Sequence, residues 1–157
     1  MLGRKKESRE IDGLVYDVTQ LGGIDARNVL LRLMKSLGPS LGALADSPLS
    51  AVFEKLALSE ADLGYFCEKF GSCSFVHLED GKLPRLDKVF DDHFAGRTGA
   101  MVKWLVFAVE VNFSDFLDGA KARLGKLSKL GFAPTSSPSM SPSTSIGQSG
   151  ESSPTQE

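Results

Sequence analysis

Four side chains of this sequence could act as soft metal ligands: Cys67, Cys73, His77 and His93. Structural zinc sites are usually built from close pairs such as C-x-x-C or H-x-x-x-H, and these four residues show neither spacing. Cys67 and His93 also fall on the apolar faces of expected helices. We therefore expect structural roles for these side chains, with no metal or cofactor bound.

Asp91, Asp92 and His93 are the best candidates for acid–base chemistry. Adjacent residues of a helix point about 100° apart, so the three side chains would not converge on one substrate. A solvated acidic edge beside a core histidine is the favoured interpretation. The sequence also lacks the nucleophile elbow G-x-S-x-G and the glycine-rich phosphate loops. We therefore expect no catalytic residues, and a small enzyme with a site near Asp91 and His93 is the less favoured alternative.

The segment Gly96-Arg97-Thr98-Gly99 precedes an expected helix, whose free N–H groups could hold an anion together with Arg97. A plain break between two helices, with Arg97 paired to an acidic neighbour such as Asp92, is the favoured alternative.

Composition excludes several classes of partner. The chain has 157 residues and a formal net charge of -2, with no basic field for a nucleic acid backbone. The longest apolar stretch is interrupted by Lys103 and Glu110, so it does not reach the roughly 20 residues that a membrane span needs. The charged start of the chain does not resemble a signal peptide. We expect a soluble protein with reduced thiols in a cytoplasm.

The elements that position these residues are mostly helices. Asp12-Gly13 between β-prone runs predicts a tight N-terminal hairpin, because glycine accepts the positive φ of such a turn. Asp80-Gly81 predicts a second hairpin near 73–84, whose return strand Pro84 confines to an edge. Apolar residues at steps of three and four predict helices. Five helices are expected. Asp25 and Thr98 are the expected caps of two of them, and a capping box at Ser59 begins a third. The other two begin at Ser47-Pro48 and near Leu86.

The helix after Gly96 is apolar on nearly every side. Its polar positions form one narrow stripe: Lys103, Glu110, Ser114 and Asp118. The apolar side chains around Trp104 must be covered by the domain or by a partner, and we expect most of them to form the core. Asn112 lies on the apolar side, where it either satisfies backbone groups at a bend, the favoured alternative, or contacts a bound partner.

The predicted fold is mainly α, a single compact helical domain with a small β-hairpin and a disordered tail. Gly119, Gly125 and Gly131 weaken the segment after residue 119, which we expect to be partly helical. The Ser, Thr and Pro residues that follow cannot offset their ordering entropy by burial. The expected organisation is a charged flexible arm at 1–9, the domain at 10–119, a basic and leucine-rich segment at 120–132, and the disordered tail at 133–157.

Two stretches resemble the phage tail assembly chaperones, small helical proteins encoded just before the tape measure protein of long-tailed phages. One is EIDGLVYDVTQLGGIDARNVLLRLMKSLGPSLGAL; the other is HFAGRTGAMVKWLVFAVEVNFSDFLDG, with its glycine-arginine break, apolar helix and Asn112-Phe113 ending. With the connecting part, the resemblance covers about Glu10 to Gly119. These motifs record a helical shape and an apolar helix and contain no catalytic signature.

The resemblance implies a non-enzymatic protein of the bacterial host cytoplasm, from a phage or prophage and absent from the mature virion. Its partner would be the tape measure protein, and a second partner would be the tail tube protein that assembles around it. In many such chaperones a ribosomal frameshift extends some copies, so the Ser/Pro tail would be an unshifted ending or a linker. A tail without function is the equally weighted alternative. A small helical adaptor or regulator is the alternative.

A helix that is apolar on nearly every side, followed by a leucine- and lysine-rich segment, is suited to holding an amphipathic helix in a groove. We expect partner contacts where the covering domain ends along this helix. The candidate residues are Phe113, Phe116, Leu117, Leu124 and Leu127.

Overall fold

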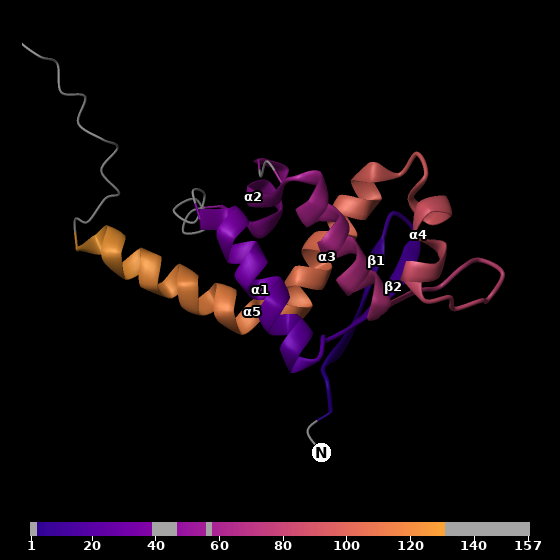
Figure 1. Cartoon of the computed structure of the whole chain (residues 1–157), viewed down its shortest axis with the longest axis horizontal. Helices are drawn as coiled ribbons and strands as arrows, with labels where there is room; N and C mark the ends of the chain where they lie inside the picture. Colours follow the sequence, from indigo (N-terminus) through magenta and orange to yellow (C-terminus); the bar gives the residue numbers. More distant parts are fainter. Residues whose placement is uncertain (1–2, 39–46, 56–57, 131–157) are drawn as a thin grey trace, which may run out of the picture.

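The structure is a computed structural model that describes residues 3–38, 47–55 and 58–130. Five helices and three short strands make up this part of the chain, as the prediction of a mainly α fold requires (Figure 1). In chain order they are β1 (Lys6–Ile11), β2 (Leu14–Thr19), α1 (Gly23–Leu37), α2 (Leu49–Lys55), α3 (Glu60–Ser72), β3 (Ser74–Val76), α4 (Leu86–Phe94) and α5 (Thr98–Lys129). The segment 133–157, expected to be disordered, lies outside the described residues.

The N-terminal hairpin turns where the sequence predicts it. Asp12 and Gly13 both have positive φ, at 50° and 84°, which matches the twist that a two-residue turn needs. Strand β1 pairs antiparallel with β2. Ile11 lies opposite Leu14 beside the turn, and Lys6 lies opposite Thr19 at the other end of the ladder. Strand β1 therefore starts at Lys6, inside the segment 1–9 that we expected to be a flexible arm. An ion pair of 2.9 Å from Lys6 to Asp17 of β2 accompanies this longer pairing.

The second hairpin expected near 73–84 contributes one strand to the same sheet. Strand β3 pairs antiparallel with β2, so β2 is the central strand of a three-stranded sheet. The return arm makes a single bridge, between Phe75 and Arg85, because Pro84 has no N–H with which to extend a ladder. A tight turn with Gly81 at a φ of 80° joins the two arms.

Helix starts agree with the sequence in part. Ser59 caps α3, and its side chain accepts a hydrogen bond from the backbone N–H of Asp62, as the capping box predicts. The expected cap of α1 is wrong: Gly22 precedes the helix, and Asp25 lies in its first turn. Asp25 instead accepts a 3.0 Å hydrogen bond from Lys69 of α3, which joins the two helices.

The first half of α5 forms the centre of the core. Trp104 is fully buried, and the residues from Trp104 to Val109 are at most 6 % exposed. The rings of Phe90 and Phe94 from α4 lie 5.6 and 5.7 Å from the Trp104 ring, and the Trp104 indole N–H donates to the buried Ser74 hydroxyl. The expectation that the apolar residues around Trp104 form the domain core is confirmed.

The first two residues of the polar stripe of α5 contact the N-terminal hairpin. Lys103 pairs with Asp12 at 2.6 Å, and Glu110 pairs with Arg9 at 2.8 Å. The guanidinium of Arg9 also lies 4.3 Å from the centre of the Phe107 ring. The stripe therefore orients the hairpin along α5, although each exposed pair contributes only about 0–1 kcal/mol.

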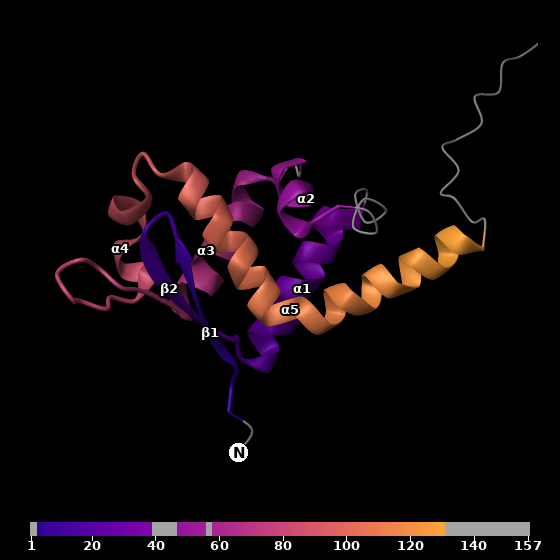
Figure 2. The ribbon, with the colours of Figure 1, turned by 180° about the vertical axis from the view of Figure 1, so that it is seen from behind.

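Helix α5 bends at Phe113, where φ is -132° and ψ is 17°. Beyond the bend, residues 114–129 form a C-terminal arm that projects past the other helices and is seen from both sides (Figures 1 and 2). The helix continues to Lys129 despite Gly119 and Gly125, so the segment expected to be partly helical is one continuation of α5.

Asn112 holds this bend. Its amide oxygen accepts a 2.7 Å hydrogen bond from the backbone N–H of Leu21, and its amide nitrogen donates to the Ala108 carbonyl at 2.8 Å. Gln20 donates to the carbonyl of Val111 at 3.2 Å. Side chains that enter a helix ladder in this way are a recognised cause of kinks. The favoured interpretation of Asn112, an amide that satisfies backbone groups at a bend, is confirmed.

Candidate protein-binding groove

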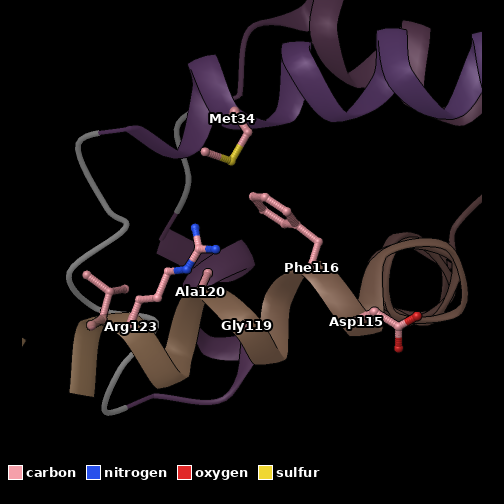
Figure 3. A pocket seen from close by; sticks show the side chains of 7 residues that line it. Met34, Asp115, Phe116, Gly119, Ala120 and Arg123 are labelled. Atoms are coloured by element: carbon pink, nitrogen blue, oxygen red, sulfur yellow. The ribbon is translucent and has the colours of Figure 1, made fainter. Parts of the chain in front are cut away.

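A groove lies between the end of α1 and the C-terminal arm of α5. It has a volume of about 420 Å³ and is lined by Met34, Asp115, Phe116, Gly119, Ala120, Arg123 and Leu124. In the close-up, Phe116 points from the arm toward Met34 of α1, and Ala120 follows one turn further along the arm (Figure 3).

The apolar wall of the groove follows from residue spacing. Phe116, Ala120 and Leu124 are four residues apart, so they share one face of the arm. Gly119 adds no side chain there, which leaves space between them. An added Cβ at Gly119 would meet no heavy atom within 4 Å. The groove is therefore open and largely apolar, with Phe116 being 38 % exposed.

The five residues proposed to contact a partner have different environments. Phe113 and Leu117 are buried, at 6 % and 5 % exposed, and the Phe113 ring packs edge-on against Phe70. Phe116 and Leu124 line the groove. The side chain of Leu127 lies outside the described residues. Of the four described side chains, Phe116 and Leu124 are the two that line the groove.

Sequence reasoning did not identify Met34, Ala120 or Arg123 as lining residues. The spacing of Met34 places it on the apolar face of α1 and indicates nothing about a second helix. The spacing of Phe116, Ala120 and Leu124 was available as a signal, but the approach of α1 is a long-range contact that no local pattern indicates.

A second hollow is lined by three of the residues considered for acid–base or anion chemistry, Asp92, His93 and Arg97. Its volume is about 610 Å³, and its lining includes Asp12, Leu78, Asp92, His93 and Arg97. Asp92 and Arg97 are not joined by an ion pair, so the pairing that we favoured for Arg97 is wrong. Asp92 is exposed, whereas Arg97 is half-buried.

His93 makes its hydrogen bond on the side of this hollow that faces the core. Its Nε2 shares a 2.7 Å hydrogen bond with the hydroxyl of Tyr16, a residue with no exposed surface. Burial lowers the pKa of His93, and the nearby charge of Arg97 lowers it further. The imidazole therefore joins α4 to β2 through a part-buried hydrogen bond, and Asp91 is exposed.

The remaining soft ligands are also held apart by separate contacts. Cys67 is buried, and the half-buried Cys73 donates to the carbonyl of Phe70 at 3.3 Å. Burial raises the pKa of each thiol to about 11, which disfavours the reactive thiolate. His77 lies 3.0 Å from the carboxylate of Asp17. Within the described ranges, no group of three or more His, Cys, Asp or Glu side chains could hold a metal ion.

None of the described helices combines the length and the apolar character required to cross a bilayer.

Comparison with known proteins identifies the family. The described domain is a small helical unit with a three-stranded sheet and an open apolar groove, and residues 12–125 match the family model of the phage tail assembly chaperone protein, TAC. The chain belongs to the phage tail assembly chaperone family, and its role is that of a chaperone in tail assembly. No curated protein and no solved structure gave a significant match.

Proposed function

We propose that the protein binds the tape measure protein of its own phage and assists assembly of the tail tube around it, without catalysing a reaction. The family supports a chaperone role with tail proteins. The tape measure protein is the proposed partner, with the tail tube protein as a second one. This work would take place in the cytoplasm of the bacterial host, during phage or prophage expression, and the chaperone would be absent from the finished particle.

The groove between α1 and the arm of α5 is the observation that carries this proposal. Phe116 and the partly buried Leu124 line this groove together, whereas the other exposed large apolar side chains of the described residues, Ile24, Leu31, Leu83 and Leu130, do not line it. Exposed apolar surface of this kind is characteristic of sites that bind other polypeptides. A helix laid into a groove would cover Phe116 and Leu124 with its own apolar face.

Co-expression with the tape measure protein tests the proposal. Wild-type chaperone should keep the tape measure protein in the soluble fraction. Phe116→Asp or Leu124→Asp should reduce that fraction at least about fivefold, because a carboxylate in the groove is costly to desolvate. The readout is soluble tape measure protein per unit of chaperone, measured by immunoblot.

Leu83→Asp is the matched control. Leu83 is 46 % exposed and lies in the loop between β3 and α4, at the end of the molecule opposite the arm (Figure 1). It should leave the soluble fraction unchanged, and thermal melts should show that all three variants fold. The proposal fails if the tape measure protein is equally soluble without the chaperone, or if the groove variants behave like the control.

A further inference from the structure

The charges around the groove are unevenly distributed. Asp115 lines the groove near the bend, and Arg123 lines it two turns further along the arm. After Asp118, the arm carries cations and no carboxylate through Leu130. Those cations are Lys121, Arg123, Lys126 and Lys129. The groove is thus acidic at the bend and basic at its far end.

Arg123 is distinguished by its place in the groove, because Arg27, Lys35 and Arg97 also take part in no ion pair among the described residues. Arg9, Arg32, Lys69 and Lys103 are each paired with a carboxylate. Among the described residues, no ion pair involves a cation of α5 beyond Lys103. Lys126 and Lys129 lie in the last turn of α5, where the negative end of the helix dipole favours cations. The dipole does not account for Arg123, which lies earlier and points a guanidinium into the groove (Figure 3).

From this arrangement we infer that the groove binds an amphipathic helix of a tail protein. The bound helix carries Asp or Glu side chains in its first turn and lies antiparallel to the arm. The inference rests on the proposed function and specifies the chemistry of its partner. The apolar wall from Phe116 to Leu124 is about 12 Å long at 1.5 Å per residue, so it matches two to three turns of such a helix.

Charge and dipole favour the same direction. Carboxylates are stabilised in the first turn of a helix, and an antiparallel partner would bring its first turn to Arg123. The positive end of the partner's dipole would then lie beside the negative C-terminal end of α5. A cation in the last turn of the partner would meet Asp115 at the bend. A guanidinium binds a carboxylate through two parallel hydrogen bonds, which makes Arg123 suited to this contact.

Peptide binding to the full-length chaperone tests the inference. Overlapping 25-residue peptides covering the tape measure and tail tube proteins would be labelled, and binding followed by fluorescence anisotropy. Captured peptides should contain an amphipathic helix with Asp or Glu in its first turn. Arg123→Glu should weaken their binding about tenfold, and added salt should weaken wild-type binding.

Lys121→Glu is the matched control, because it makes the same charge change on the same arm. Lys121 lies about 140° around the helix from Phe116, away from the groove, and its reversal should change affinity less than about twofold. Peptides whose first-turn carboxylates are replaced by Lys should bind Arg123→Glu better than they bind the wild type. This charge swap separates a direct contact from damage to the fold.

Each other result overturns the inference. If Phe116→Asp abolishes binding but Arg123→Glu does not, the groove binds tail proteins without acidic recognition, and only the proposed function survives. If neither the peptides nor the intact tape measure protein bind the wild type, both fail. A dimer in sedimentation that Phe116→Asp dissociates and peptides leave intact would identify a second copy as the occupant. Much tighter peptide binding by a chain ending at Leu130 would identify the chaperone's own C-terminal residues.

Discussion

Asp17 shows how a single residue joins the sheet to its surroundings. Its carboxylate, on the central strand β2, accepts a hydrogen bond from Ser8 and lies 2.9 Å from Lys6 and 3.0 Å from His77. Burial alone would raise the pKa of Asp17, but the hydrogen bonds from Ser8, Lys6 and His77 outweigh it and lower the pKa to about 2. The ionised carboxylate is therefore stabilised by both neighbouring strands.

This lowered pKa predicts a loss of stability in acid. Between about pH 4 and pH 2 the unfolded chain binds the proton of Asp17 more readily than the folded one, so the free energy of unfolding falls as the pH falls. The contribution is fully present above about pH 4. Asp17→Asn should lower the free energy of unfolding at pH 7, and the difference from wild type should shrink below pH 4 in urea titrations.

Asp118→Asn, an exposed change on the arm, is the control for this titration and should follow the wild-type curve at every pH. A constant difference between Asp17→Asn and wild type from pH 7 to pH 2 would contradict the assignment. The sequence pattern does not predict that Asp17 is buried, because Asp17 alternates with apolar residues as a solvent-facing strand position would. Its burial depends on β1 and β3 lying on both sides of β2.

Among the elements, α5 shows what a sequence can and cannot predict. The apolar stretch, its break at Gly96 and the bend near Asn112 were readable from local residue types. The pairing of Lys103 and Glu110 with the hairpin was not, because their partners Asp12 and Arg9 are about a hundred residues away in sequence. The second hairpin shows the same limit, since β3 forms its ladder with β2 and makes only one bridge to the segment after the turn.

Asn112→Ala should destabilise the domain and loosen the bend. Its removal leaves the N–H of Leu21 without the hydrogen bond that joins α5 to the β2–α1 connection. The free energy of unfolding should fall by about 1–3 kcal/mol, the cost of an unsatisfied group that is not fully exposed. Chemical denaturation measures this change.

Asn28→Ala supplies the comparison for Asn112→Ala. Asn28 is an exposed residue of α1, and its replacement should change the free energy of unfolding by less than about 0.5 kcal/mol. Equal effects of the two substitutions would show that the bend does not depend on Asn112.

On the scale of the whole molecule, the family match and the described domain cover nearly the same part of the chain. The match ends at residue 125, whereas α5 continues to Lys129. The sequence supports a fold class and a family because apolar periodicity and turn residues are local. It did not predict that Met34 of α1 lines the groove, because Met34 and Phe116 are 82 positions apart and their approach depends on the bend at Phe113.

Removal of residues 133–157 should leave the melting temperature unchanged. This segment is rich in Ser, Thr and Pro and has few large apolar side chains, so it has little with which to stabilise the domain. A chain ending at Phe132 should melt within about 1 °C of the full chain in calorimetry, since each kcal/mol shifts the melting temperature by several degrees. A clear loss of cooperativity would place the domain boundary further along the chain.

The bend at Phe113 divides one continuous helix into two halves with unequal protection of the backbone. The amides of the first half are shielded by the core, and their protons should exchange with deuterium only when much of the domain opens. Those of the arm face water along much of their length and can exchange through local fraying. A single helix therefore contains both slow and fast amides, and Asn112 marks the boundary between them.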